Sequence, residues 1–343
     1  MNLFYNNANK VFIIAELSAN HGHKKETAIE TIIAAKKAGA DAIKLQTYTP
    51  DTMTIECDNE YFMIREGLWK GRTLYDLYKE AYTPWEWHED LFKTARNEGL
   101  VCFSTPFDKS AVDFLEELNN PIYKIASFEI HDIPLIEYAA SKGKSMILST
   151  GIAELPDIDL AIKTCRKAGN NDITLLKCTS AYPAPVEEAN LATIPNLQDT
   201  FGVKAGLSDH TLGITVPIVA TTLGATVIEK HFILDKKIGG PDASFSLDLD
   251  EFSAMVKAVR ETENSIGKVK YELSEKVKKS MIFGRSLFAI EDIKEGEFLT
   301  DRNVKSIRPG YGLHPKHYHY VLGKRAKCNI SKGFPIKFSY LID

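Results

Sequence analysis

The sequence predicts an α/β fold, a (β/α)8 barrel of the TIM type followed by a small β-rich domain, on three observations. Eight short apolar runs rich in β-branched residues alternate with amphipathic, helix-like segments. Continuous apolar strands separated by helices are typical of a parallel sheet with both faces covered, and eight such units over roughly 250 residues are typical of a closed barrel. No G-x-G-x-x-G motif follows the first run, which disfavours a dinucleotide-binding open sheet.

The predicted strands and helices alternate from residue 11 onward. The strands are expected over Val11–Ala15, Ala42–Gln46, Leu100–Ser104, Ile122–Ile125, Ser145–Ser149, Ile173–Cys178, Val203–Leu207 and Thr226–His231. Helices are expected over Thr27–Ala38, Trp85–Glu98, Ala111–Leu118, Leu135–Ser141 and Asp157–Ala168. Glycine follows several of these helices, as the position after a helix end prefers.

The chain is expected to hold a barrel catalytic domain over 1–266, a linker over 267–283 and a small domain over 284–343. Asp250–Ser265 has the pattern of a last helix, and Lys268–Lys279 is polar and charged, as a linker would be. The final domain is rich in turns and short strand-like runs. Two similar phrases in it, DIKEGE and NISKGF, indicate a weak internal repeat.

The composition restricts the class of protein. Hydrophobic residues make up 44% of the 343 residues and charged residues 26%, so a globular chain is expected rather than a disordered one. The net charge of −4 disfavours a general nucleic-acid binder. The charge is uneven, because residues 284–343 hold 11 Lys or Arg against 6 Asp or Glu, a net +5 that leaves −9 for the first 283 residues.

The cysteines and the apolar runs predict the compartment. Five cysteines without a C-x-x-C pair indicate a reduced chain without a zinc ribbon. The first ten residues lack the basic and apolar regions of a secretory signal. No apolar run approaches the roughly 20 residues of a membrane helix. We therefore expect a soluble, cytoplasmic protein with no membrane and no nucleic-acid partner.

Polar residues gather where the predicted strands end, which is where barrel enzymes carry their function. Lys44 and Lys124 lie inside apolar strands, and a buried lysine without a partner is costly, so both are expected in a polar barrel mouth. A serine or threonine at a strand end often only caps the next helix. Together with two lysines, however, such hydroxyls form the chemistry that a phosphate needs.

Two histidines close successive strands. His210 and His231 each stand beside a carboxylate, and their side chains are expected to meet at the mouth as a metal site. A single histidine there would more often be a core residue. Glu16 and Glu129 also end strands, and each is either a salt-bridge partner of a lysine or a catalytic group.

A resemblance to a known family rests on eight strings that span almost the whole chain. They are AELSANHGH, GADAIKLQTY, FSTPFD, YKIASFE, LSTG, KCTSAYPAP, GLSDHTLG and EKHF. In this order and spacing they resemble the sialic acid synthase family. The tail strings KSIRPGYG and GKRAKCNISKG resemble the antifreeze-protein-like (SAF) domain of that family. The resemblance implies a transferase that condenses phosphoenolpyruvate with an amino-sugar aldehyde and water, releasing phosphate by C–O cleavage.

The resemblance also implies roles for the residues. Catalytic roles are implied for Glu16, Lys44, Lys124, Glu129, His210 and His231, and His210 and His231 would hold a divalent metal, Mn2+ or alternatively Mg2+ or Co2+. Substrate contacts are implied for Gln46, Thr105, Ser127, Ser149, Ser180, Tyr182, Ser208, Asp242 and Arg308. Ser180 departs from the family pattern, because the sialic acid branch has asparagine there.

Two loops resemble one branch of the family, the pseudaminic acid branch. They are Gly67–His88 and Arg308–Tyr318. The implied sugar is 2,4-diacetamido-2,4,6-trideoxy-L-altrose, and flagellin glycosylation is the implied use of the product. The resemblance further implies a domain-swapped homodimer, in which the tail domain caps the partner's barrel and Arg308 enters the neighbouring site. The alternative for Arg308 is an ordinary surface arginine in a turn.

Three other functions are compatible with parts of the pattern. The nearest is an N-acetylneuraminate or legionaminate synthase with the same mechanism. A non-catalytic sugar- or ice-binding protein built around the tail would leave the polar strand ends without a purpose. A metal-dependent aldolase or sugar isomerase could use the same barrel, but neither would release phosphate from phosphoenolpyruvate.

Overall fold

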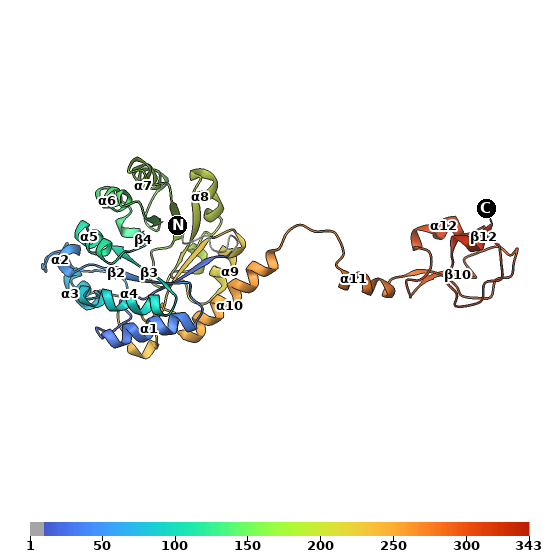
Figure 1. Ribbon diagram of the computed structural model, residues 1–343, viewed down its shortest axis with the longest axis horizontal. Helices are drawn as coiled ribbons and strands as arrows, with labels where there is room; N and C mark the ends of the chain where they lie inside the picture. Colours follow the sequence, from blue (N-terminus) through green and yellow to red (C-terminus); the bar gives the residue numbers. More distant parts are fainter. Residues whose placement is uncertain (1–9, 343) are drawn as a thin grey trace. The chain divides into compact units, whose positions relative to one another are not determined.

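The computed structural model describes residues 10–342 and contains a closed barrel of eight parallel strands (Figure 1). Each strand is hydrogen-bonded to the next in chain order, and β8 pairs with β1. The predicted barrel is confirmed, with strand ends shifted by up to two residues. The strands are β1 (Phe12–Glu16), β2 (Ala42–Thr47), β3 (Val101–Pro106), β4 (Ile122–Ile125), β5 (Ser145–Ser149), β6 (Ile173–Cys178), β7 (Lys204–Asp209) and β8 (Val227–His231).

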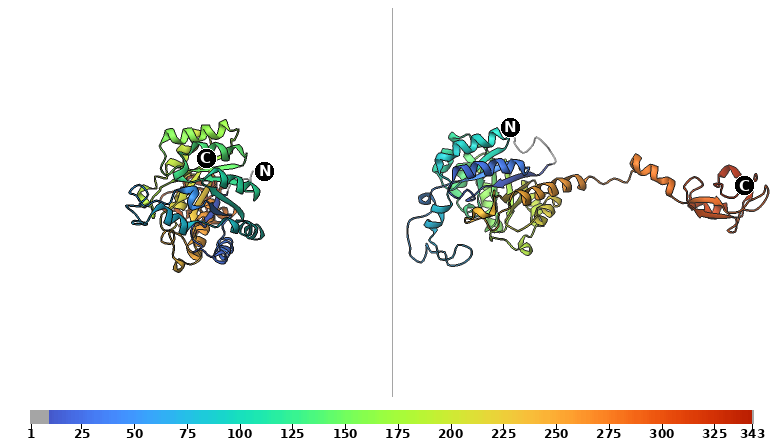
Figure 2. Two further views of the ribbon diagram at one scale, coloured as in Figure 1. Left: turned by 90° about the vertical axis from the view of Figure 1, so that its left-hand side faces the viewer. Right: turned by 90° about the horizontal axis from the view of Figure 1, so that it is seen from below.

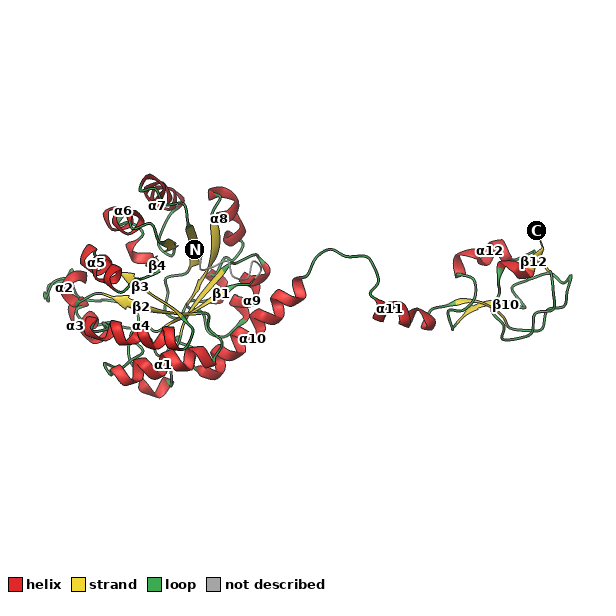
Figure 3. Cartoon of the chain, viewed as in Figure 1, coloured by secondary structure: helices red, strands yellow, loops and turns green. Residues whose placement is uncertain are grey.

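Helices surround the strands (Figure 3). Those that follow the barrel strands are α1 (Lys25–Lys37), α4 (His88–Asn97), α5 (Lys109–Glu117), α6 (Ile133–Ser141), α7 (Leu155–Lys167), α8 (Thr193–Phe201), α9 (Thr215–Thr222) and α10 (Leu249–Ile266). The connection between β2 and α4 is longer and carries α2 (Pro50–Met53), α3 (Leu74–Ala81) and the 3-10 helix η2 (Trp85–Trp87). Figure 2 shows the segment between α2 and α3 projecting from the barrel. Three further 3-10 turns in the barrel unit are η3 (Ser127–Glu129), η4 (Val186–Glu188) and η5 (Lys236–Ile238).

Side-chain caps fix where several helices begin. The carboxylate of Asp108 accepts hydrogen bonds from the backbone at the start of α5, and Asp132 does the same for α6. Asp248 and Glu251 form a reciprocal capping box at the start of α10. Such caps satisfy backbone N–H groups that have no partner within the helix. They also fix where the chain turns from each strand end into the following helix.

The barrel interior near the amino ends of the strands is apolar. One side chain from each of seven strands forms this apolar layer, and all are fully buried: Ile14, Ala42, Phe103, Ile122, Ile147, Leu176 and Val227. The remaining strand, β7, contributes Gly206, where an added Cβ would lie 2.3 Å from the carbonyl oxygen of Val227. A larger core fills the space between the strands and the helices. The barrel is therefore a packed solid on which a site can be built.

One arginine fastens the last helix to the first strands. Arg260 on α10 pairs with Asp41 at 2.6 Å and donates to the carbonyl oxygen of Val11 at 2.8 Å. Asp41 also accepts from the backbone N–H of Ile13 at 2.9 Å. These contacts join α10, β1 and the turn before β2.

The second compact unit begins at Lys268 and has its own core. It contains β9 (Ser286–Ala289) antiparallel to β10 (Val304–Ile307), β11 (Arg325–Ala326) antiparallel to β12 (Leu341–Ile342), and the short helices η7 (Pro315–His317), α12 (Tyr318–Val321) and η8 (Phe338–Tyr340). Its buried apolar side chains include Leu287, Leu299, Val304 and Ile336. The small domain predicted for the tail is thus present.

The weak repeat in the tail corresponds to reciprocal contacts. Ile293 and Ile330 exchange two backbone hydrogen bonds of 2.8 Å. Asp292 accepts from the backbone N–H of Lys332, and in the equivalent position Asn329 accepts from that of Glu295, both at 2.8 Å. The two similar phrases therefore pack against each other as equivalent halves of one small core.

The segment between the two cores is exposed. Residues 264–281 are all exposed, although the stretch predicted as a linker contains the short helix α11 (Glu275–Lys279) and the 3-10 turn η6 (Ser280–Phe283). No helix within residues 10–342 is long and apolar enough to cross a membrane. Residues 1–9, on which the expectation about a secretory signal rested, lie outside the described residues.

Candidate active site

A polar layer lies directly above the apolar layer in the barrel interior. Side chains two residues apart on a strand share a face, so the residue two positions after each apolar-layer residue also points into the barrel. At this level the eight strands present Glu16, Lys44, Thr105, Lys124, Ser149, Cys178, Ser208 and Glu229, each no more than 5% exposed. The structure thus brings together six residues that the sequence places in the site.

Four charged groups form the centre of the polar layer. The ammonium of Lys44 lies 2.8 Å from Glu16 and 3.7 Å from Glu229, and that of Lys124 lies 3.5 Å from Glu229. Lys44 also donates to the hydroxyl of Thr105 at 3.2 Å. Two cations and two carboxylates thus meet in a water-poor interior, where electrostatic interactions are strong.

Burial and neighbouring charges move the pKa values of this cluster apart. Burial raises the pKa of Glu16 to about 7, although the Lys44 ammonium opposes the rise. Burial also disfavours the ionised form of Glu229, but Lys124 and Lys44 outweigh it and hold the pKa of Glu229 below its usual value. Burial lowers the pKa of Lys124. Among these four groups, the neighbouring lysines therefore favour the ionised form of Glu229, whereas burial brings the pKa of Glu16 to near neutral pH.

A cradle of hydroxyl groups surrounds Gly151 after β5. The backbone N–H of Gly151 donates to the hydroxyl of Ser127 at 3.2 Å. A Cβ at position 151 would lie 2.1 Å from the hydroxyl oxygen of Ser180 and 2.7 Å from that of Ser127, so only glycine fits. The hydroxyl of Ser149 is buried without a hydrogen-bond partner among the described residues. Converging hydroxyls beside two lysines can bind an anion such as a phosphate.

Two imidazoles close β7 and β8. The ring centroids of His210 and His231 are 5.3 Å apart. The Nδ1 atom of His210 lies 3.1 Å from the carbonyl oxygen of Thr179, which leaves Nε2 for another partner. The Nδ1 atom of His231 is buried with no hydrogen-bond partner among residues 10–342, and Asp242 stands 3.7 Å from it. Burial lowers the pKa of His231 well below its usual value, so its ring is neutral.

These imidazoles fit a divalent metal as a two-nitrogen site. Within residues 10–342 no group of three or more His, Cys, Asp or Glu side chains is arranged around one metal position. A neutral imidazole with an unpartnered nitrogen is a good ligand for such a metal. A hydrogen bond from the other ring nitrogen to a carbonyl, as His210 makes, is the usual way to orient such a ligand.

The remaining predicted contacts line the mouth. Gln46 donates to Glu16 at 2.9 Å and to Ser18 at 3.0 Å, and Ser18 donates to Asp242. The ring of Tyr182 lies 4.5 Å from that of His210, centroid to centroid. The first set of contacts joins β2 to β1 and to the loops after β1 and β8, and the Tyr182 contact joins the loop after β6 to the end of β7.

Two further predicted residues belong to elements other than the barrel strands. Glu129 lies in η3, one of its carboxylate oxygens is buried without a hydrogen-bond partner among the described residues, and burial raises its pKa to about 7. Arg308 belongs to the second compact unit, where it is exposed and directly follows β10.

The sequence assigned no role to three residues that the structure puts in the site. Glu229 lies between the two lysines, Cys178 has its sulfur 3.8 Å from the imidazole of His210, and Ser18 connects Gln46 to Asp242. Strand alternation could have identified Glu229, because it is two residues before His231 and shares its face. Ser18 has a backbone φ of 47°, which no sequence pattern signals.

Comparisons with known proteins agree with this geometry. The model of the NeuB family matches residues 31–271, and the SAF domain model matches residues 284–341. The chain is 51% identical over 333 residues to a pseudaminic acid synthase of Campylobacter jejuni, covering 97% of each chain. It is 49% identical over 325 residues to the pseudaminic acid synthase of Helicobacter pylori, covering 94% of this chain and 96% of that one.

More distant relatives share the same architecture. An N,N'-diacetyllegionaminic acid synthase of Legionella pneumophila is 34% identical over 335 residues, covering 96% of this chain and 94% of that one. The crystal structure of an N-acetylneuraminic acid synthetase from Leptospira borgpetersenii superposes with a TM-score of 0.71 at 32% identity, covering 80% of this chain and 90% of that chain. Because the family model matches the barrel and these relatives align over nearly the whole length of the chain, this chain belongs to the NeuB family.

Proposed function

We propose that this chain is a pseudaminic acid synthase, which condenses phosphoenolpyruvate with 2,4-diacetamido-2,4,6-trideoxy-β-L-altropyranose and water to give pseudaminic acid and phosphate. The choice of sugar depends on one observation, the difference in sequence identity between two groups of relatives. Identity is 49–51% to pseudaminic acid synthases and 34% to a diacetyllegionaminic acid synthase, over similar lengths. The charged layer and the hydroxyl cradle support the phosphoenolpyruvate half of the reaction.

Phosphoenolpyruvate binds at the polar layer in this proposal. Lys44 and Lys124 supply positive charge, and the hydroxyls of Thr105, Ser127, Ser149, Ser180 and Ser208 supply hydrogen bonds to the phosphate and carboxylate. The buried hydroxyl of Ser149 has no hydrogen-bond partner within residues 10–342, and such a group gains most from a bound anion. Because Glu229 stays ionised between the lysines, it limits how much negative charge the layer accepts and orients the ammonium groups.

The bond changes follow from the reactants. C3 of phosphoenolpyruvate attacks the aldehyde carbon of the open-chain sugar, the new alkoxide oxygen takes a proton, and positive charge develops at C2. Water adds to C2 and loses a proton, and the C2–O bond to phosphate then breaks to leave the ketone. Glu16, whose pKa lies near 7, is placed here as the group that stabilises the cation at C2 and guides the water.

His210 and His231 would hold the divalent metal, most suitably Mn2+, with Mg2+ or Co2+ as alternatives. When bound, the metal supplies Lewis acidity that polarises the sugar carbonyl. Gln46, Tyr182, Asp242 and Glu129 are assigned to the sugar side of the site. Gln46 and Asp242 are already joined through Ser18, so they form one polar edge that a sugar hydroxyl can contact.

The tail domain is assigned to a domain-swapped homodimer, in which Arg308 reaches the partner's barrel. The opposite net charges of the two parts, −9 for the first 283 residues and +5 for the rest, favour such an association. An Arg308→Ala chain mixed with a Lys124→Ala chain should then regain activity in mixed dimers. If subunits exchange and activity stays absent, the arginine does not act across the dimer. The five free cysteines are compatible with a cytoplasmic enzyme, and flagellin glycosylation is a use of the product in keeping with this assignment.

A phosphate-release assay tests the proposal. Purified protein with Mn2+ is given phosphoenolpyruvate and, in parallel, the diacetamido-trideoxy-altrose, the legionaminic acid precursor and N-acetylmannosamine. We expect the first sugar to be preferred over N-acetylmannosamine by on the order of 10²-fold in kcat/KM. Comparable efficiency with N-acetylmannosamine would move the protein to the sialic acid branch, and no phosphate release with any sugar would overturn the synthase assignment.

The metal assignment has its own test. A chelator should abolish turnover, and Mn2+ should restore it. Calorimetric titration should give Mn2+ binding to the metal-free protein that His210→Ala and His231→Ala each remove, while the far-ultraviolet circular dichroism stays unchanged. Full turnover in chelator, or unchanged Mn2+ binding by both variants, would contradict the assignment.

A further inference from the structure

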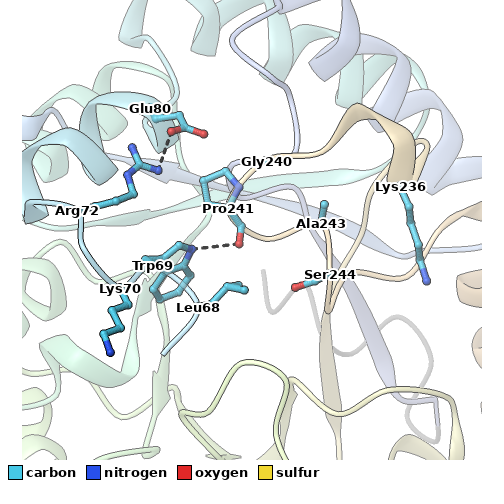
Figure 4. A pocket seen from close by; sticks show the side chains of 10 residues that line it. All are labelled: Leu68, Trp69, Lys70, Arg72, Glu80, Lys236, Gly240, Pro241, Ala243 and Ser244. Carbon is cyan, nitrogen blue, oxygen red and sulfur yellow. Dashed lines mark hydrogen bonds and ion pairs between the residues drawn. The ribbon is translucent and has the colours of Figure 1, made fainter. Parts of the chain in front are cut away.

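Two loops of the barrel unit, together with Glu80 of α3, line an open pocket of about 610 Å3 that none of the assigned roles uses. One loop holds residues 68–72, between α2 and α3, and the other holds residues 236–244, between β8 and α10. Figure 4 shows Leu68 and Trp69 of the first loop across from Ala243 and Ser244 of the second. The indole N–H of Trp69 joins the loops by donating to the carbonyl oxygen of Pro241 at 3.2 Å.

The pocket adjoins the candidate active site through a row of aromatic rings. The indole of Trp69 lies 5.7 Å from the ring of Tyr182, centroid to centroid, and Tyr182 lies 4.5 Å from His210. Asp242 directly follows Pro241, whose carbonyl oxygen accepts the hydrogen bond from Trp69. A sugar whose carbonyl group lies at His210 would therefore extend along the ring of Tyr182 towards Trp69.

The lining favours a neutral group with an apolar part. Leu68 is 51% exposed at the pocket, Ala243 and Pro241 add apolar surface, and Ser244 adds an exposed hydroxyl. Two of the cationic lining residues already have partners.

Arg72 is paired with Glu80 at 2.7 Å, and Lys236 is paired with Glu251 at 2.6 Å. Figure 4 shows the third, Lys70, directed away from Ser244. With Arg72 and Lys236 paired to carboxylates and Lys70 directed away, the lining presents little positive charge to an anion. An aromatic wall, aliphatic contacts and one hydroxyl match the methyl and amide parts of an acylamino group.

We propose that this pocket is the subsite for the acylamino group that the sugar carries away from its reacting carbonyl, and that Trp69 is the residue that selects for it. The inference rests on the proposed function, because it concerns the sugar of that reaction. Trp69 acts in two ways: its ring forms the wall of the subsite, and its N–H fixes the loop that carries Asp242. Phosphoenolpyruvate binds at the lysines in the polar layer, so its binding does not depend on Trp69.

The test compares two sugars that differ in one acyl group. They are 2,4-diacetamido-2,4,6-trideoxy-L-altrose and its analogue with a free 4-amino group, assayed with wild type, Trp69→Ala and Trp69→Phe. Trp85→Phe is the matched control, because the Trp85 indole also donates to a loop carbonyl, that of Tyr48 at 3.1 Å, but does not line the pocket.

We expect Trp69→Ala to lower kcat/KM for the diacetamido sugar by on the order of 10- to 100-fold, mainly through the sugar KM. The 4-amino analogue should lose much less, so the preference for the acylated sugar should shrink by a similar factor. The KM for phosphoenolpyruvate should not change. Trp69→Phe, which keeps a ring but loses the N–H, should fall between wild type and Trp69→Ala, and Trp85→Phe should match wild type.

Equal losses for the two sugars in Trp69→Ala would overturn the subsite and leave Trp69 with a merely structural role. An unchanged preference would overturn it as well. Failure of the proposed function has a different sign: the wild type would turn over another N-acylated sugar in place of the diacetamido altrose. The variants would then be compared on that sugar and its deacylated analogue. Calorimetric titration gives the dissociation constants of both sugars without turnover, and Trp69→Ala should weaken binding of the acylated sugar more than binding of the 4-amino analogue.

Discussion

The two layers inside the barrel differ in chemistry although they share strands, direction and burial. The apolar layer and the polar layer are two residues apart on each strand, so that Ile122 and Lys124 point into the same interior from neighbouring levels. The apolar layer is a packed core that favours folding. The polar layer concentrates two lysines, two glutamates and the Cys178 thiol, five ionisable groups whose charged forms would be better solvated in water. The comparison shows that residues serving stability and residues serving chemistry lie only two positions apart on each strand of this fold.

The largest expected effect comes from replacing the charge in the polar layer. Lys124→Met keeps the length of the side chain but leaves Glu229 with one ammonium partner and the anion site with half its charge. We expect kcat/KM for phosphoenolpyruvate to fall on the order of 10³-fold or more, since each charge-assisted contact contributes about 1.5–3 kcal/mol and more than one is lost. Phosphate-release kinetics measure it.

A control for that variant is its melting temperature. Lys124→Met should stay folded, because Lys44 remains as an ion-pair partner of Glu229 and the buried carboxylate is not left uncompensated. A variant that retains wild-type kcat/KM would contradict the division between the layers.

The matching change in the apolar layer should act on stability. Ile122→Ala leaves a cavity in a fully buried site, and such truncations reduce the free energy of unfolding by about 2–5 kcal/mol. Denaturant unfolding measures this loss. Below the melting transition, kcat should remain within a few-fold of wild type. If Ile122→Ala lost as much kcat as Lys124→Met while still folded, the two layers would not be separable.

The hydroxyl cradle gives a smaller effect of a mixed kind. Gly151→Ala puts a methyl group 2.1 Å from the hydroxyl oxygen of Ser180, so that this side chain must move. Displacing Ser180 removes a hydrogen bond proposed for the bound anion, which is worth about 1.5–3 kcal/mol, so the KM for phosphoenolpyruvate should rise roughly 10- to 150-fold. A Gly151→Ala/Ser180→Ala double variant should recover part of the loss. No recovery would mean that the cradle fails for another reason.

The smallest expected effect is a dependence of stability on pH. The pKa of Glu16 is about 7 in the folded protein against an ordinary value of 4.5. Between these values the folded chain keeps a proton that the unfolded chain releases, so the free energy of unfolding falls as pH rises from about 5 to 7. Glu16→Gln removes this contribution.

The melting temperature of wild type relative to Glu16→Gln should therefore decrease over that pH range. Glu129 also has a raised pKa, but it titrates in both proteins and cancels in the comparison. A constant difference between the two curves would contradict the assignment of the proton to Glu16.

Much of this division was available from the sequence. Continuous apolar runs predicted the eight strands, and a lysine inside each of two such runs predicted a polar barrel mouth. Strand alternation could have placed Glu229 on the inward face of its strand, but not between Lys44 and Lys124, because that position arises only when β2, β4 and β8 converge across the interior. Helix α9 was not among the predicted helices, because its β-branched residues favour strands locally and tertiary packing against α10 determines its form.

The loops above the polar layer were the least predictable part. The segment Gly67–His88 was identified only by its resemblance to one branch of the family. The sequence could not reveal that Trp69 would reach Pro241, which lies 172 residues away in the chain. The positive φ of Ser18, which directs its hydroxyl towards Gln46 and Asp242, likewise depends on long-range contacts.

The exposed segment 264–281 has a consequence for how the two compact units can be handled and exchanged. It holds several lysines in accessible backbone, so limited trypsin digestion should cut there before it cuts either core. After cleavage, no covalent tether would hold the SAF unit near a barrel. Its association with a barrel would then depend on the protein concentration in solution instead of the high effective concentration that a tether provides. The same tether would let a gene fusion supply one unit from a different family member, so that barrel and tail can be recombined as modules.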